Sequence, residues 1–191
     1  GTVTLGGWHH FGRFGSPRFD RSGGSLANPS SSGLARRFRG NSGIYGIVDQ
    51  TIYREPDDPN DGASVFVRLS GSPSGRNLLD LYLDAGIGYK GLLPGRSDDT
   101  IGIAFAVERI SKSARGFDRD TLLFGGAPSP RRSSEALLEV SYQAILGPGV
   151  TVQPDFQYVF RPSGGIANPR DPYGRRIRNA AVFGLRATIR Y

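Results

Sequence analysis

Residues 180–191 read AAVFGLRATIRY, and the side chains along this segment alternate between two kinds. One face carries Ala181, Phe183, Leu185, Ala187, Ile189 and Tyr191, and the other carries Val182, Gly184, Arg186, Thr188 and Arg190. A repeat of two residues is typical of a β-strand with one apolar face. We therefore predict a strand here, apolar on one side and bearing arginines on the other.

The same alternation recurs in four earlier segments, at residues 63–70, 79–90, 135–146 and 150–161. Three more segments, residues 2–13, 43–54 and 100–110, are predicted strands with apolar side chains in both registers, so their faces stay unassigned. The sequence contains neither an internal repeat nor a linker. We therefore predict about eight strands and one β-barrel unit that comprises residues 1–191.

The length of these strands indicates a membrane protein. Most of them run for ten to twelve residues, which exceeds the roughly five or six of soluble sheets and matches the roughly 9–11 that cross a bilayer at a tilt. Short turns at residues 56–62, 92–99 and 147–149 alternate with long polar loops at residues 14–42, 114–133 and 162–179 and a shorter one at residues 71–77 on the same rim. Long loops on one rim and short turns on the other are typical of outer-membrane barrels. The fold class is thus all-β, a transmembrane antiparallel β-barrel, with the C-terminus on the short-turn side.

Composition excludes several other classes of protein. The apolar stretches are far shorter than the roughly 18 residues of a membrane helix. The chain has no Cys and no Met, which excludes disulfides and thiolate metal sites and predicts a processed or trimmed chain. The net charge is +7, and all basic residues except Lys90 and Lys112 are arginines. Because these arginines are scattered, a soluble protein that binds nucleic acid is the disfavoured alternative.

Four segments carry a resemblance to a known family. They are GIYGIVDQTIYREP from Gly43, LYLDAGIGYKGLLPGRSDDTIGIAFA from Leu81, VTVQPDFQYVFRPSGG from Val150 and the terminal AAVFGLRATIRY. In combination they resemble the carbohydrate-selective porins of Gram-negative outer membranes, the OprB family. The resemblance implies a sixteen-stranded barrel with a sugar-conducting channel, of which this chain resembles the C-terminal half. It also implies a terminal Phe, where this chain has Tyr191.

The polar faces of the strands supply the candidate functional residues. We predict that they line a pore: Arg68, Asp80, Tyr82, Asp84, Lys90, Glu139, Asp155, Gln157, Arg161, Arg186 and Arg190. Carboxylates and arginines exchange hydrogen bonds with sugar hydroxyls, and Tyr82 and Phe66 can stack on a pyranose. The expected function is passive diffusion of carbohydrates and other small polar solutes, without a cofactor. The alternative for each residue is an ion pair that stiffens the wall.

Aromatic residues at the ends of apolar faces are expected at the membrane interface. Tyr89, Phe160 and Tyr191 occupy such positions and form the predicted membrane girdle. We expect outer-membrane lipids and lipopolysaccharide as neighbours, and a homo-oligomer stays open. Arg36, Arg37 and Arg39 either add positive charge at the pore mouth or bind lipopolysaccharide phosphates. The runner-up function is a non-conducting structural or interaction subunit of a cell-envelope assembly.

The sequence gives no positive support for an enzyme. Asp80 and Asp84 lie four residues apart on one strand, about 13 Å by the rise per residue, which exceeds the spacing of catalytic glycosidase pairs. His9 and His10 are adjacent and point to opposite faces of a strand, so they do not share a metal. The stretch DDPNDG at residues 57–62 has Pro59 at a ligand position and lacks a closing glutamate, so we predict a turn.

Overall fold

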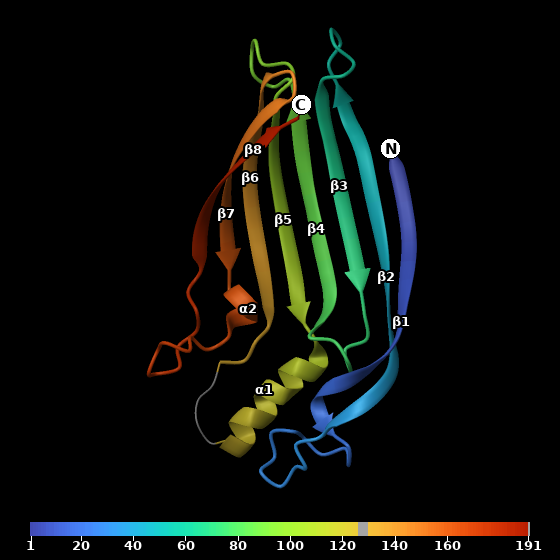
Figure 1. Cartoon of the computed structure of the whole chain (residues 1–191), viewed down its shortest axis with the longest axis vertical. Coiled ribbons are helices and arrows are strands. Elements are labelled where there is room, and N and C mark those ends of the chain that lie inside the picture. Colours follow the sequence, from blue (N-terminus) through green and yellow to red (C-terminus); the bar gives the residue numbers. More distant parts are fainter. Residues whose placement is uncertain (126–129, 191) are drawn as a thin grey trace.

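The computed structural model describes residues 1–125 and 130–190, and in these residues eight strands form one antiparallel sheet (Figure 1). The strands pair in chain order: β1 (Thr2–Asp20), β2 (Ala35–Arg54), β3 (Gly62–Gly71), β4 (Leu79–Lys90), β5 (Thr100–Ile110), β6 (Ser134–Gly147), β7 (Val150–Phe160) and β8 (Ala180–Ile189). Two helices, α1 (Lys112–Gly125) and α2 (Pro162–Gly165), lie at one end of the sheet. The predicted eight strands and the all-β class are confirmed.

The strand register assembles one continuous apolar face. A single row of cross-strand neighbours crosses all eight strands: Val3, Val48, Val67, Ala85, Phe105, Leu138, Tyr158 and Ala181. This row fixes the faces of β1, β2 and β5, which the sequence left open. Its large side chains are open to the surroundings, as Val3 at 70% and Phe105 at 44% exposure illustrate. An outward apolar band of this kind is what a barrel presents to lipid.

The connections divide the sheet into two different ends. Residues 55–61, 91–99 and 148–149 form the short-turn end, where β8 also finishes. Residues 21–34, 72–78, 111–133 and 161–179 form the long-loop end. The predicted alternation of short and long connections, and the position of β8 relative to them, are confirmed.

Two of the predicted long loops are wrong in extent. Residues 14–42 are not one loop, because β1 continues to Asp20 and β2 begins at Ala35, with Phe14 paired to Phe38. Register shifts after His10 and after Gly15 bend this long hairpin. Arg36, Arg37 and Arg39 therefore lie on β2. Residues 114–133 are also not a plain loop, because most of α1 falls within them.

The two edges of the sheet are far apart. Within residues 1–125 and 130–190, β1 pairs only with β2, and β8 pairs only with β7. The strands therefore form a curved open wall, with the β1 and β8 edges on opposite sides (Figure 1). In this part of the chain, no helix is long and apolar enough to cross a membrane.

Candidate functional site

The face opposite the apolar row carries the polar side chains. One row of cross-strand neighbours on it runs from β2 to β8 through Asp49, Phe66, Gly86, Ala104, Glu139, Gln157 and Val182. The next row contains Arg68 on β3 opposite Asp84 on β4. The structure thus places charged and small residues together on one side of the wall, as the alternation predicts.

A shallow hollow of about 620 Å³ lies in this polar face. Its wall includes the Phe66 ring and these polar or small residues: Thr2, Asp49, Thr51, Ser64, Gly88, Gly102, Ala104, Glu139 and Ser141. The small residues of β4 and β5 deepen the centre of the wall, because no bulky side chain rises from them. The volume falls within the roughly 300–1,000 Å³ of pockets that hold small molecules.

Phe66 is held in place over a glycine. A Cβ atom at Gly86 would lie 2.6 Å from the Phe66 ring and 2.9 Å from the carbonyl oxygen of Ile103. Any residue other than glycine would therefore displace either the ring or the backbone of β5. An aromatic ring packed over a strand glycine fixes the strand register and leaves an apolar surface at the hollow.

Arg68 and Asp84 form the main ion pair of the polar face. Arg68 Nε donates to Asp84 Oδ1 at 2.9 Å, and Nη2 donates to Oδ2 of the same carboxylate. The Arg68 side chain is 49% exposed, whereas the Asp84 side chain is only 9% exposed. The carboxylate is thus part of the wall, and the guanidinium is the group that remains open to solvent.

Other predicted pore-lining residues have partners that tie the wall together. Asp80 is buried, and it accepts hydrogen bonds from Arg109 Nε at 2.7 Å and from the backbone N–H of Lys112 at 3.2 Å. Lys90 donates to Asp61 at 2.9 Å near the short-turn end. Gln157 donates to Glu139 at 2.9 Å, beside the hollow. The structure therefore does not gather the predicted residues at a single constriction.

The remaining candidates lie on β4, β7 and β8 and just beyond β7 and β8. Tyr82 lies on β4, between Ser70 on β3 and Glu108 on β5. Asp155 packs over Gly184, and Arg186 and Arg190 are exposed on or just after β8. Arg161 has a left-handed backbone (φ 51°), and its Nη2 donates to Ser134 Oγ at 2.8 Å at the long-loop end. Tyr89 and Phe160 lie on the apolar face, opposite Ile101 and Ala136, at the ends of their strands. Tyr191, the third predicted girdle residue, lies outside the described residues.

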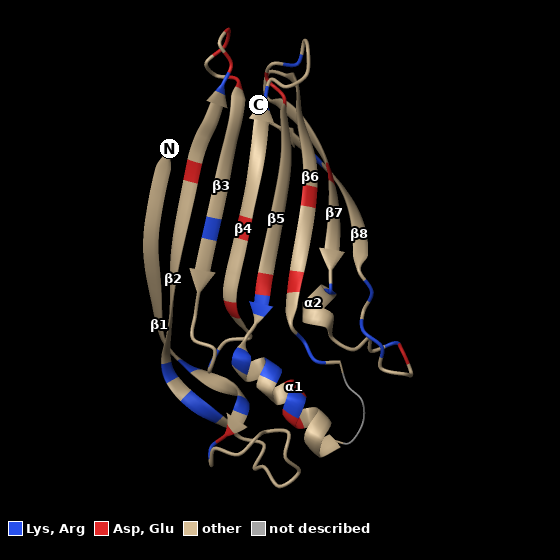
Figure 2. Ribbon diagram, turned by 180° about the vertical axis from the view of Figure 1, so that it is seen from behind, with Lys and Arg blue, Asp and Glu red and all other residues tan. Residues whose placement is uncertain are grey.

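The two ends of the wall differ in their balance of charge, with an excess of carboxylates at one end and of basic residues at the other (Figure 2). Carboxylates gather in the short turns: Glu55, Asp57, Asp58, Asp61, Asp98 and Asp99. Basic residues gather at the long-loop end: Arg18, Arg36, Arg37, Arg39, Lys112, Arg115, Arg119, Arg131, Arg132, Arg170, Arg175, Arg176 and Arg178. The charge of the chain is therefore distributed along the direction of the strands.

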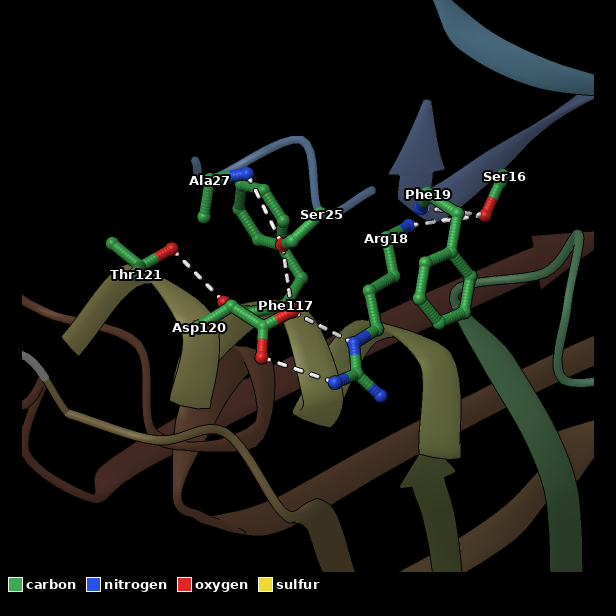
Figure 3. Close-up of polar contacts among 8 residues, drawn as sticks. All are labelled: Ser16, Arg18, Phe19, Ser25, Ala27, Phe117, Asp120 and Thr121. Atoms are coloured by element: carbon green, nitrogen blue, oxygen red, sulfur yellow. Dashed lines mark hydrogen bonds and ion pairs between the residues drawn. The ribbon is translucent and has the colours of Figure 1, made fainter. Parts of the chain in front are cut away.

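Helix α1 is fastened to the β1–β2 hairpin by a partly buried ion pair that sequence reasoning missed (Figure 3). Arg18 at the end of β1 donates from Nε to Asp120 Oδ2 at 2.8 Å and from Nη2 to Oδ1 at 3.0 Å. Ser25 Oγ adds a third hydrogen bond to Asp120 Oδ2 at 2.6 Å. The helix therefore extends from the end of β5 to the end of β1 across the long-loop end. No local sequence motif predicts this contact, because Arg18 and Asp120 are 102 residues apart.

The Arg18–Asp120 contact predicts a pH-dependent helix position. The hydrogen bond from Arg18 holds the pKa of the Asp120 carboxyl below its ordinary value of 3.8. Because the folded state favours the ionised form, the contact contributes fully above about pH 4 and is lost as pH falls through the lower, folded pKa. We expect Asp120→Asn to loosen α1 at pH 7, where the unaltered helix is held firmly.

The absence of Cys allows a clean measurement of this effect. A single spin label at Leu123→Cys, an exposed position on α1, reports the mobility of the helix. Asp171→Asn is the control, because it removes a carboxylate bound to Arg175 in another loop. Equal label mobility at pH 7 with and without Asp120→Asn would show that the Arg18–Asp120 ion pair does not hold α1 in place.

Comparisons with known proteins agree with this architecture. The family model described as "Carbohydrate-selective porin, OprB family" matches residues 1–191. Porin B of Pseudomonas aeruginosa is 26% identical over 155 residues, which covers 75% of this chain and 31% of that protein. The structure of OprB from Pseudomonas putida at high pH superposes with a TM-score of 0.85 and 21% identity, over 98% of this chain and 44% of that chain.

These matches identify the wall as part of a larger porin fold. The chain spans about a third of the curated relative and less than half of the solved porin chain. The open sheet of eight strands corresponds in fold to that portion of the barrel. The resemblance seen in the sequence is confirmed: the chain belongs to the OprB family of carbohydrate-selective porins, which are outer-membrane proteins of Gram-negative bacteria.

Proposed function

We propose that the polar face of this sheet lines a water-filled channel through which carbohydrates and other small polar solutes diffuse passively. The observation that carries the proposal is the separation of the two faces. One face is a continuous apolar row for contact with lipid, and the other holds charged groups around a hollow. Channels of this kind obtain selectivity from their width and their lining groups.

The chemistry of the hollow suits sugars. Glu139 and Asp49 line the hollow and offer acceptors to hydroxyl groups. The exposed Arg68 guanidinium, on the same face but outside the lining of the hollow, offers donors. Phe66 presents an apolar ring of the kind that packs on a sugar face. The proposal involves no bond breaking and no cofactor, since a solute needs only weak and reversible contacts to pass.

Planar-bilayer conductance, with and without added sugars, tests the proposal. Ser141→Trp places a large side chain in the hollow, whereas Val140→Trp places the same side chain on the lipid face one residue away. We expect Ser141→Trp to lower single-channel conductance by about twofold, because it occupies the passage, and Val140→Trp to leave it unchanged.

The result also discriminates between the two candidate roles. Stepwise openings that sugars partly block would support the channel. An inserted chain that stays silent as an isolated unit, while the longer protein conducts, would assign the channel to the larger barrel. Equal conductance in both tryptophan variants would contradict the assignment of the polar face to the passage.

A further inference from the structure

A second hollow, of about 560 Å³, lies at the long-loop end and is strongly basic. Its wall consists of Lys112, Arg115, Arg119, Arg131, Arg132, Ser133 and Arg176. We refer to these residues as the basic pocket. It shares no lining residue with the hollow on the polar face of the sheet.

Three separate segments build the basic pocket. Lys112, Arg115 and Arg119 are spaced by three and four residues, so they share one side of α1. Arg131, Arg132 and Ser133 follow in the segment that leads into β6. Arg176 comes from the loop between α2 and β8, where it packs over Gly165 and donates from Nη2 to the carbonyl of Arg131 at 3.3 Å.

The position of the segment before β6 is fixed by backbone contacts. The Ser133 N–H donates to the carbonyl of Gly164 in α2 at 2.9 Å, and the Ile110 N–H donates to the carbonyl of Ser133 at 2.9 Å. These bonds join the ends of β5, β6 and β7 at this point. The part of the basic pocket formed by the segment before β6 is therefore anchored at the ends of these strands.

The positive charge in the basic pocket is only partly neutralised. Asp118 forms a paired contact with Arg132, with Nη2 to Oδ1 at 2.7 Å and Nε to Oδ2 at 3.0 Å. The same carboxylate also accepts the backbone N–H of Arg132 at 2.9 Å, so its oxygens are already engaged. Among residues 1–125 and 130–190, the buried Nε of Arg115 has no hydrogen-bond partner.

A bound anion would offset the positive charge that Asp118 leaves unneutralised. Like charges held together repel each other, whereas an anion between them is attracted to all of them. Guanidinium groups match the tetrahedral oxygens of a phosphate with paired, charge-assisted hydrogen bonds. A pocket of this volume also has room for more than a bare ion.

We infer that the basic pocket binds the phosphate monoester of a phosphorylated sugar at the long-loop end. Two sources share this chemistry: a soluble sugar phosphate, and the phosphorylated sugars of lipid A in the outer leaflet. In both cases the phosphate accepts hydrogen bonds from Arg115 and Arg119, and Ser133 adds a neutral donor. The site recognises charge, whereas the hollow on the polar face suits neutral hydroxyl groups.

Calorimetric titration of the full-length protein in detergent with glucose 6-phosphate tests the inference, with glucose as the uncharged probe. The test variant is Arg115→Gln/Arg119→Gln, and the control is Arg170→Gln/Arg178→Gln, which removes the same charge from exposed positions at the same end. We expect the test variant to bind glucose 6-phosphate about tenfold more weakly or worse, since each lost contact is charge-assisted. The control should change the affinity little.

A second arm distinguishes the two sources. Diphosphoryl lipid A in mixed micelles is titrated in place of the sugar phosphate, with dephosphorylated lipid A for comparison. Tight binding of the diphosphoryl form alone, weakened in the test variant, would assign the site to lipopolysaccharide. Tight binding of glucose 6-phosphate, similarly weakened, would assign it to a soluble solute.

The inference is overturned if neither phosphorylated probe binds more tightly than its uncharged counterpart. Equal weakening in the test and control variants would also overturn it, because the effect would then be general charge and not the pocket. Binding in detergent requires no open channel. A failure of the proposed channel function would therefore leave this result unaffected, and the reverse also holds.

Discussion

Phe105→Arg is expected to destabilise the folded protein in a bilayer by about 2–4 kcal/mol, the cost of arginine at the midplane of a lipid-facing strand. Phe105 lies in the middle of β5, between Ala85 on β4 and Leu138 on β6, and its ring is partly open to the surroundings. An arginine there would place its charge in hydrocarbon, with no polar neighbour in the row.

Ala104→Arg is the matched control, because it introduces the same side chain one residue away. Ala104 lies on the polar face opposite Glu139, so the new guanidinium would face water and a carboxylate. Urea titrations in lipid vesicles, followed by the fluorescence of Trp8, the one tryptophan, measure both variants. Similar losses of stability in the two variants would show that the faces are assigned incorrectly.

Arg68→Ala is expected to cost about 1–3 kcal/mol of stability, because it leaves the Asp84 carboxylate in the wall without its guanidinium. The asymmetry of exposure decides which partner matters more. Asp84 is almost covered, whereas Arg68 is half open to solvent. Asp84→Ala should therefore cost less than about 1 kcal/mol, since the freed Arg68 can turn toward water.

The double variant Arg68→Ala/Asp84→Ala completes a thermodynamic cycle for this pair. We expect it to be about as stable as Asp84→Ala alone, because no buried charge remains unpaired. The same urea titration measures all three variants. An Asp84→Ala protein that is less stable than Arg68→Ala would contradict the assignment of the carboxylate to the wall and the guanidinium to the solvent.

Strand positions could be predicted from the sequence wherever one face carries charge. Charged residues recur every fourth position on one face of β4 (Asp80, Asp84) and at β8 (Arg186, Arg190), and there the alternation alone gives the correct faces. In β5, the polar side of the wall carries Gly102, Ala104 and Ala106. Hydropathy does not distinguish small apolar residues on the polar face from apolar residues that face lipid. Only the pairing of β5 with β4 and β6 therefore shows which of its faces is which.

The errors at the long-loop end have a different physical origin. The face of α1 that packs on the hairpin carries Ser113, Gly116 and Asp120, and these buried positions are small or polar. The packed face therefore lacks large apolar residues, and a polar, arginine-rich segment of this kind resembles a loop in the sequence. Similarly, the arginine-rich C-terminal part of β1 and N-terminal part of β2 resemble a loop in the sequence, although their backbones pair with each other. Contacts between distant residues, which a single sequence does not display, hold both features.

The excess of carboxylates at the short-turn end and of arginines at the long-loop end makes the wall electrostatically polar along the strands. Fields from fixed charges act over about 8 Å at physiological ionic strength and are focused by low-dielectric walls. Near this wall, a negatively charged solute is attracted at the long-loop end and repelled at the short-turn end, whereas the net charge of a neutral sugar is zero at both. The polarity of the wall therefore distinguishes the direction in which an ion approaches and not the direction in which an uncharged sugar does.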